Sequence, residues 1–294
     1  MRLMCLNHGG LLLEPGGPRE VSLFQAIRHS EIDVLLLQEL GINWHKMGRP
    51  GQWQERIKKA LNAQCTRSRC FHNVHDKTGT RQQWGGTGIL AHGPMSHLAM
   101  GAGCDKAKLG RWSWARYRGK HGMVLRCVSI YRPVKDKANS GSVWNQHKRY
   151  FDSQNDDRDP QVAFWADLRT EIQEWLQSGD QLIIGGDVNA EVRDPAVDSF
   201  FTNLGLHNLV FEHHDPTNTP TTYFCNTKGK VMDSLWGSAN LCPQGLPWGP
   251  LCHLDLHFLP SRSGPQPASL PPTQTKEPHA KPTSDCQEIP SRLQ

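Results

Sequence analysis

Residues 182–191 read LIIGGDVNAE: an apolar run, two glycines, and then an aspartate and an asparagine separated by one valine. The apolar run predicts a buried strand, and the glycines allow a ligand or another backbone segment to approach its end closely. Asp187 and Asn189 are two positions apart, so an extended chain sends both side chains to the same side. The stretch predicts a strand that ends in a polar site, although an ordinary Asp/Asn turn is the better explanation when the motif is taken alone.

Four more polar residues occupy similar places on other apolar segments. Asn7 ends RLMCLN, Glu39 follows DVLLLQ, Tyr131 ends RCVSIY, and Asp233 lies within KVMDSLW on an otherwise apolar face. Carboxylates are expensive to bury without a partner, so at one end of a sheet these residues would form a divalent-metal hydrolase site. Oxygen ligands without cysteine favour Mg²⁺ or Mn²⁺ over Zn²⁺.

The order of the predicted elements favours a layered α/β domain, because strands and helices alternate at first and hairpin-like pairs come later. VSLFQAIRHS predicts a helix with Val21, Phe24 and Ile27 on one face. Asp159 is an N-cap candidate for a longer helix, and TTYFCNTKGKVMDSLW predicts a hairpin. We expect one domain over residues 1–259 and a disordered tail over residues 260–294, whose Pro, Ser and Thr cannot bury enough apolar surface to order it.

The bulk composition sets weaker limits. The 294 residues are 37% hydrophobic and carry a formal net charge of +5, which suits a polyanionic partner and an ordinary soluble protein equally well. Nine cysteines, without a CxxC pair, argue against a disulfide framework and against a zinc ribbon. Neither a signal peptide nor a membrane-spanning segment is predicted, so we expect a soluble intracellular protein of undetermined compartment, without an obligate protein partner.

The segment from residue 106 to residue 135 contains nine Lys or Arg residues and no acid, interleaved with Trp112, Trp114 and Tyr117. Such a segment could lie along a DNA backbone, with the aromatic rings stacking on bases. It could equally be a twisted strand pair with solvated arginines and core tryptophans, and the sequence leaves both explanations open.

Over residues 2–238 the sequence resembles the endonuclease/exonuclease/phosphatase family. The resemblance rests on the order of five motifs: Asn in the first strand, Gln-Glu, Tyr-x-Pro, Gly-Asp-x-Asn and a late Asp. GGTGIL before VSIYRP, and SVWNQHKRY after it, are most similar to the endonuclease domains of retrotransposons without long terminal repeats. The resemblance implies a four-layer α/β sandwich, in which two packed mixed β-sheets are flanked by helices. It also implies Mg²⁺-dependent hydrolysis of phosphodiesters, with DNA as partner and Mn²⁺ as an alternative metal.

The resemblance also assigns roles to the polar residues. Glu39 would ligate the metal, Asn7 would position the metal or a phosphate, and Tyr131 would contact the scissile phosphate. Asp187 would orient or deprotonate the attacking water, and Asn189 would stabilise the transition state.

By the same resemblance Asp233 would hold a catalytic histidine, but here the sequence departs from the family. The family closes with Ser-Asp-His, and this chain has HLDLH at residues 253–257 with no Asp-His neighbours. His257 or His253 could substitute, but the Pro-rich sequence that begins where the closing strand should finish favours loss of the histidine and an incomplete last strand. We therefore keep three hypotheses: an endonuclease of retroelement origin with impaired activity, a lipid or inositol phosphate phosphatase, and a catalytically inactive nucleic-acid-binding remnant.

Overall fold

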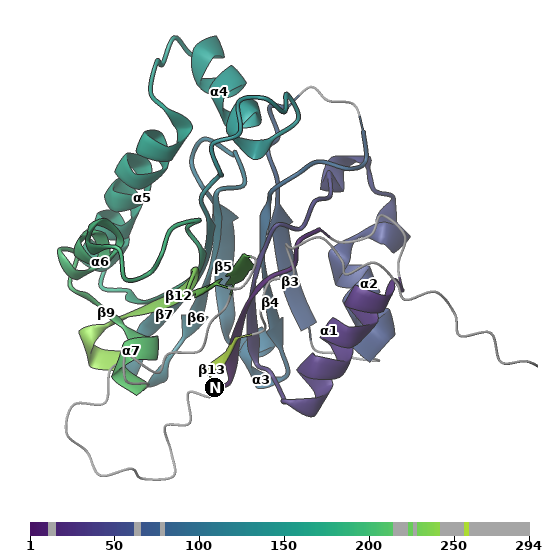
Figure 1. Ribbon diagram of the computed structural model, residues 1–294. Coiled ribbons are helices and arrows are strands. Elements are labelled where there is room, and N and C mark those ends of the chain that lie inside the picture. Colours follow the sequence, from purple (N-terminus) through teal and green to yellow (C-terminus); the bar gives the residue numbers. More distant parts are fainter. Residues whose placement is uncertain are drawn as a thin grey trace, which may run out of the picture. The chain divides into compact units, whose positions relative to one another are not determined.

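The computed structural model shows two β-sheets packed face to face, with helices on both outer faces (Figure 1). This arrangement confirms the predicted four-layer α/β sandwich. The residues described are 1–10, 16–61, 66–76, 80–213, 223–225, 228–241 and 256–258. The predicted boundary at residue 259 and the predicted tail lie outside them.

The first sheet is mixed and has the strand order β13-β1-β2-β4-β3. Its strands are β1 (Leu3–Asn7), β2 (Val34–Gln38), β3 (Thr66–Phe71), β4 (Thr87–His92) and β13 (Leu256–Phe258). β13 and β2 flank β1 in parallel, whereas β4 pairs antiparallel with both β2 and β3. Every residue of β1 and β2 is buried, as expected of apolar strands that are covered on both faces.

The second sheet is also mixed and has the order β5-β6-β7-β8-β12-β9. Its strands are β5 (Ala99–Cys104), β6 (Trp112–Arg118), β7 (Val124–Tyr131), β8 (Gln181–Asp187), β9 (Leu206–Asn208) and β12 (Asp233–Ser238). β7 and β8 are parallel. The predicted hairpin is present as β10 (Tyr223–Cys225) and β11 (Lys228–Lys230), but β12 leaves it and pairs with β8.

The longer helices cover the outer faces of the two sheets, whereas two helices of five residues pack against the core between the sheets (Figure 1). The helices are α1 (Pro18–His29), α2 (Trp53–Leu61), α3 (Pro94–Leu98), α4 (Val143–Ser153), α5 (Pro160–Gln177), α6 (Pro195–Thr202) and α7 (Leu209–His213), with short 3₁₀ turns at Trp44–Lys46, Arg49–Gly51, Lys120–Gly122 and Ala239–Leu241. α1 and α2 pack on the first sheet, and α5 and α6 pack on the second. In the part of the chain that the structure describes, no helix has the length and apolarity needed to cross a membrane.

α5 begins as the sequence predicts, whereas the buried face of α1 was predicted wrongly at one position. The Asp159 side chain accepts a hydrogen bond of 2.8 Å from the backbone of Gln161 and so caps α5. In α1 the predicted core residue Val21 is 42% exposed. Glu20 and Leu23 are buried instead. Glu20 can be buried because it forms an ion pair with the buried Arg56 of α2. A charged residue on the buried face interrupts the apolar periodicity from which that face is predicted.

The glycines of β8 allow protein, not ligand, to approach closely. A Cβ on Gly185 would lie 2.8 Å from Leu235 and 2.9 Å from Leu36 across the sheet interface, and one on Gly186 would lie 1.9 Å from the carbonyl oxygen of Ile130. Both positions therefore exclude a side chain because the two sheets and the neighbouring strand pack tightly there.

The basic segment proves to be mainly structural. Asp180 is fully buried and accepts ion pairs from Arg116 at 2.8 Å and Arg126 at 2.6 Å. Arg111 is also buried and pairs with Asp167 at 2.8 Å. Acids from outside the segment neutralise these arginines. The explanation as a twisted strand pair therefore holds for them, but they are paired with carboxylates and not solvated.

Candidate active site

Four of the predicted residues meet where the carboxyl ends of parallel strands from the two sheets converge. Asn7 ends β1 and Glu39 follows β2, whereas Tyr131 ends β7 and Asp187 ends β8. The Asn7 amide donates a hydrogen bond of 2.8 Å to the Asp187 carboxylate. The Tyr131 hydroxyl donates one of 2.5 Å to Glu39. Both bonds join one sheet to the other, so side chains up to 180 positions apart form a single polar cluster.

Asn189 and Asp233 flank this cluster. The backbone N–H of Asn189 donates to Asp187 at 2.7 Å, and its side-chain amide donates to the carbonyl oxygen of Arg132 at 2.6 Å. Asp233 is buried, and its Cα lies opposite that of Asp187 in the β8–β12 pairing. Six of the seven predicted site residues thus gather at one end of the sheets.

Two of these residues have a left-handed backbone, with φ of 50° for Glu39 and 49° for Asn189. This region is uncommon for non-glycine residues, although Asn tolerates it better than Glu. At Glu39 it is maintained by a hydrogen bond of 2.7 Å from the backbone of Gly10 to the Glu39 carbonyl oxygen. Strained backbone of this kind is concentrated at functional sites, where neighbouring contacts fix it.

Burial disfavours the ionisation of both carboxyl groups. Burial raises the pKa of Asp187 to about 6, the hydrogen bond from the Asn189 backbone opposes the rise, and the charge of Glu39 adds to it. Burial also raises the pKa of Glu39, against hydrogen bonds from Tyr131 and Asn7 that lower it. Uncompensated acids in such a place favour a bound cation.

Tyr131 contributes a neutral donor. Burial raises its pKa well above the usual value, and the charge of Glu39 raises it further. The phenol therefore keeps its proton at neutral pH and presents it to the Glu39 carboxylate, which orients that acid.

The oxygen donors of the cluster fit Mg²⁺ better than a metal that requires a complete protein cage. Among the residues that the structure describes, no group of three or more His, Cys, Asp or Glu side chains is arranged to hold a metal. Mg²⁺ is commonly bound through one or two carboxylates, with water and substrate phosphate completing the octahedron. Glu39, with the Asn7 amide beside it, supplies such a partial set, and Asp187 lies next to this pair.

The remaining predicted residue, His257, lies in β13, where its Cα is opposite Met4. Met4 is three residues before Asn7 in β1, so the His257 backbone lies about 10 Å along the strands from the level of Asn7. Its side chain lies outside the described part of the structure, as does His253, so the role of His257 stays a prediction.

A buried polar layer beneath the cluster was not anticipated from the sequence. Gln38 is completely buried and donates a hydrogen bond of 2.7 Å to Ser129, which in turn donates one of 2.7 Å to the carbonyl oxygen of Leu37. The Cys5 thiol lies 3.7 Å from the other end of the Gln38 amide. Polar side chains in three neighbouring apolar strands were the available signal, and they join the two sheets directly below the candidate site.

Arg132 belongs to the basic segment, but its role at this site was not predicted. Its backbone N–H donates to the carbonyl oxygen of Asp187 at 3.0 Å. Its guanidinium donates to the carbonyl oxygens of Val188 and Asn189, the latter at 3.0 Å. These bonds fix the turn that carries both Asp187 and Asn189.

Comparisons with known proteins agree with this architecture. The model of the Endonuclease/Exonuclease/phosphatase family matches residues 7–256. Among solved structures, the catalytic domain of Xenopus laevis APE2 is similar with a TM-score of 0.54 and 17% identity, over 82% of this chain and 83% of that chain. The Neisseria meningitidis 3′-5′ exonuclease NExo has a TM-score of 0.53 and 14% identity, over 82% and 88%.

A Neisseria 3′ phosphatase NExo bound to a product DNA hairpin has a TM-score of 0.50 and 13% identity, over 79% of this chain and 86% of that chain. At these identities the likeness concerns the fold. A search of curated protein sequences finds no significant match.

Proposed function

The chain belongs to the endonuclease/exonuclease/phosphatase family, and from this membership we propose that it hydrolyses phosphodiesters of DNA with the help of Mg²⁺ or Mn²⁺. The observation that carries the proposal is the pair of hydrogen bonds between the sheets, Asn7 to Asp187 and Tyr131 to Glu39. They bring the buried Asp187, the partly buried Glu39, an amide and a phenol to one place at the ends of four strands.

In this proposal Glu39 and Asn7 hold the metal, which when bound lowers the pKa of water and neutralises charge on the phosphoryl group. Asp187 orients the attacking water and accepts its proton. A carboxylate with a pKa of about 6 suits that task, because a general base works best when its pKa lies near the working pH. The Asn189 backbone and the Asn7 amide hold the carboxylate in place.

Asn189 and Tyr131 act on the phosphate. The Asn189 amide, held on a turn fixed by Arg132, stabilises the charge that develops on the phosphoryl oxygens. Tyr131 contacts the scissile phosphate and orients Glu39. Asp233, beside Asp187, positions a histidine, for which His257 is the proposed residue.

DNA is proposed as substrate because of the fold neighbours. APE2 and the Neisseria exonuclease share this fold, and one Neisseria structure holds a product DNA hairpin. Retroelement origin is a finer proposal, supported by the sequence segments around residues 85–90 and 142–150.

A second candidate function is a catalytically inactive nucleic-acid-binding protein. It is favoured by the sequence after Asp233, which lacks the Asp-His pair with which the family closes. Removing a histidine that acts in the transition state would slow the reaction by roughly 10²- to 10⁴-fold. This candidate predicts binding of DNA without cleavage.

Conversion of supercoiled plasmid to the nicked form in Mg²⁺ tests the proposal. We expect nicking by the wild type, a rate roughly 10²- to 10⁴-fold lower for Asp187→Ala, and wild-type nicking for Asp157→Ala, an exposed acid between α4 and α5. Equal nicking by both variants would indicate a contaminating nuclease. DNA binding without nicking favours the second candidate, and phosphate release from inositol polyphosphates alone would support the phosphatase hypothesis.

A further inference from the structure

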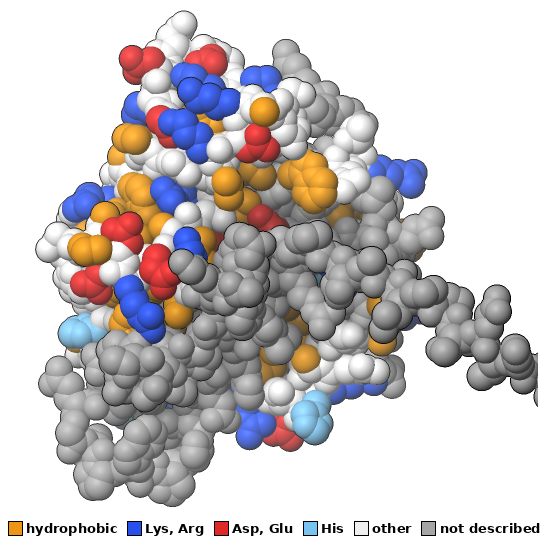
Figure 2. Space-filling model, in the orientation of Figure 1, with side chains coloured by type: hydrophobic (Ala, Val, Ile, Leu, Met, Phe, Trp, Pro, Cys, Tyr) orange, Lys and Arg blue, Asp and Glu red, His pale blue; other side chains and the backbone are white. Residues whose placement is uncertain are grey.

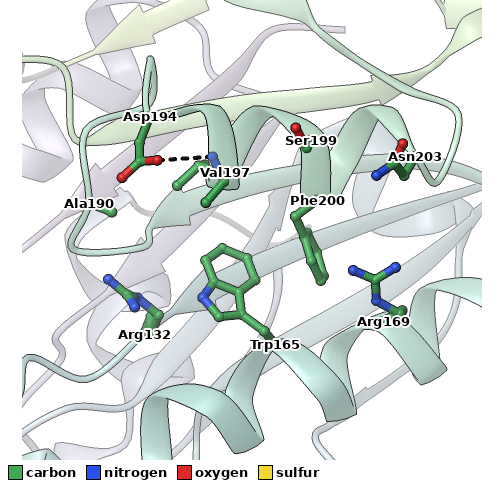
Figure 3. Close-up of a pocket in the computed structure, with 10 residues that line it drawn as sticks. Arg132, Trp165, Arg169, Ala190, Asp194, Val197, Ser199, Phe200 and Asn203 are labelled. Carbon is green, nitrogen blue, oxygen red and sulfur yellow. Dashed lines mark hydrogen bonds between the residues drawn. The ribbon is translucent and has the colours of Figure 1, made fainter.

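A cavity of about 360 Å³ lies directly beside the candidate active site. Its walls come from α5 and from the loop and helix that follow β8 (Figure 3). Ala190, which lines it, is the residue after Asn189, and Arg132, which also lines it, holds the Asn189 turn. A molecule in the cavity would thus touch the same backbone turn that carries Asp187 and Asn189.

The wall formed by α5 and α6 carries aromatic rings. Trp165 is partly exposed and lies with its ring centroid 4.4 Å from that of the buried Phe200. Figure 3 shows the two rings in a row between the side chains of Arg132 and Arg169. The Arg132 guanidinium lies 5.6 Å from the Trp165 ring centroid, and that of Arg169 lies 5.1 Å from the Phe200 ring centroid. An aromatic surface with a cation at each end results.

The charges around the cavity favour an anion, though only locally. Asp194 lies at the Arg132 end of the cavity, where the charges of Asp187 and Asp159 also act on Arg132, and its carboxylate accepts a hydrogen bond of 2.9 Å from the backbone of Ala196 and caps α6. Arg169 is exposed and has no ion pair within the described ranges. Figure 2 shows Lys and Arg interspersed with Asp and Glu over the face formed by α4, α5 and α6, so the preference comes from the cavity and not from a uniformly basic surface.

We propose that this cavity binds one unstacked nucleotide of the nucleic-acid substrate, with the base against Trp165 and the adjacent phosphates at Arg132 and Arg169. The inference rests on the proposed function and extends it to the form of the substrate. Aromatic side chains bind single-stranded nucleic acid by stacking on bases, and cations next to them bind the backbone. The volume is within the range of roughly 300–1,000 Å³ that ligand sites have.

The proposal has a consequence for the substrate. In a regular duplex each base is paired and stacked, so it reaches such a cavity only when it leaves the helix. The protein should therefore bind single-stranded, frayed or flipped nucleotides more tightly than an intact duplex. Arg132 contributes at low entropic cost, because carbonyl oxygens already hold its guanidinium in place.

The test measures binding of short fluorescent single-stranded DNA by anisotropy in EDTA, so that cleavage does not interfere. A matched oligonucleotide of abasic sugar-phosphates retains the phosphates and lacks the bases. Ser199→Trp fills the cavity from its α6 wall, and Thr202→Trp places the same ring on α6 at a residue that does not line the cavity. Arg169→Glu reverses one cavity charge.

Arg118→Glu makes the same charge change at the last residue of β6. Arg118 pairs with Val124, which begins β7 and lies about 23 Å along that strand from Tyr131 at the candidate site. We expect the wild type to bind the base-bearing strand more tightly than the abasic one by roughly 5- to 150-fold, the range for stacking of one base. Ser199→Trp should remove this preference and Arg169→Glu should weaken binding of both strands, whereas the two control variants should behave as the wild type.

Equal binding of base-bearing and abasic strands by the wild type would overturn the proposal, as would equal losses in Ser199→Trp and Thr202→Trp. Should Ser199→Trp fail to fold by circular dichroism, Arg169→Glu against Arg118→Glu still decides, since both residues are exposed. The expected binding pattern without plasmid nicking would support the cavity and count against hydrolysis. Nicking with no base preference would do the reverse.

Discussion

Replacing Asp187 by Asn tests the electrostatics of the site separately from its catalysis. The carboxyl group has a folded-state pKa of about 6, above the usual 3.8, because it is buried and lies near Glu39. Its ionisation therefore costs the folded protein more than the unfolded chain. The protein loses stability through this group as the pH rises from about 4 to about 6, and the loss is complete above that range.

The magnitude follows from the same pKa. At about 1.36 kcal/mol per pH unit, the charged Asp187 destabilises the folded state by about 3 kcal/mol at pH 8 and by about 1 kcal/mol at pH 4.5. Asn removes this charge. It still accepts the hydrogen bond from Asn189, but it places an NH₂ group against the Asn7 amide, at a cost of about 1–3 kcal/mol that does not vary with pH.

Urea denaturation in EDTA at the two pH values measures the effect. We compare the free energy of unfolding of Asp187→Asn with that of the wild type at each pH. This difference should favour the variant by about 2 kcal/mol more at pH 8 than at pH 4.5. Asp157→Asn makes the same chemical change at an exposed acid and should alter stability by less than about 0.5 kcal/mol. A difference between wild type and Asp187→Asn that is the same at both pH values would refute the interpretation that a buried, repelled carboxylate is present.

Three further changes test other parts of the structure. Tyr131→Phe removes the hydrogen bond that lowers the pKa of Glu39, so plasmid nicking should slow and the acid limb of its pH profile should move to higher pH. Asp180→Ala leaves the buried Arg126 without its partner and should destabilise the fold by about 3–5 kcal/mol in urea, whereas an unchanged midpoint would show that the pair is not needed. His257→Ala should reduce nicking without changing the thermal midpoint, and unchanged nicking would remove this histidine from the proposed site.

The strands and the polar residues at their ends could be predicted because each is a local pattern. An apolar run followed by an acid or amide identifies β2 and β8 and locates Glu39 and Asp187. What joins Glu39 to Tyr131 is the packing of one sheet on the other, and pairing between sheets has no period in the sequence. Only the resemblance to a family supplied that step.

The basic segment shows the opposite case, in which composition misleads. Nine cations without an acid suggest a nucleic-acid surface, but the acids that neutralise the arginines come from elsewhere in the chain. Asp180 precedes β8 by one residue and Asp167 lies on α5. Charge balance in three dimensions therefore differs from charge balance along the sequence, and a run of like charges identifies a partner only after the fold is known.

The position of the site follows from the way in which the two sheets are joined. The layer directly below it is polar, with Gln38 bridging to Ser129, whereas apolar side chains of both sheets, among them Leu36, Ile183 and Leu235, form a core cluster between the sheets. The hydrophobic effect has no preferred direction, whereas a hydrogen bond depends on distance and angle. Directional hydrogen bonds at Gln38, and then at Asn7 and Tyr131, join the two sheets at the end that carries the candidate site. In the proposed mechanism the polar residues of this region would therefore be both the reactive groups and the contacts that hold those groups in place.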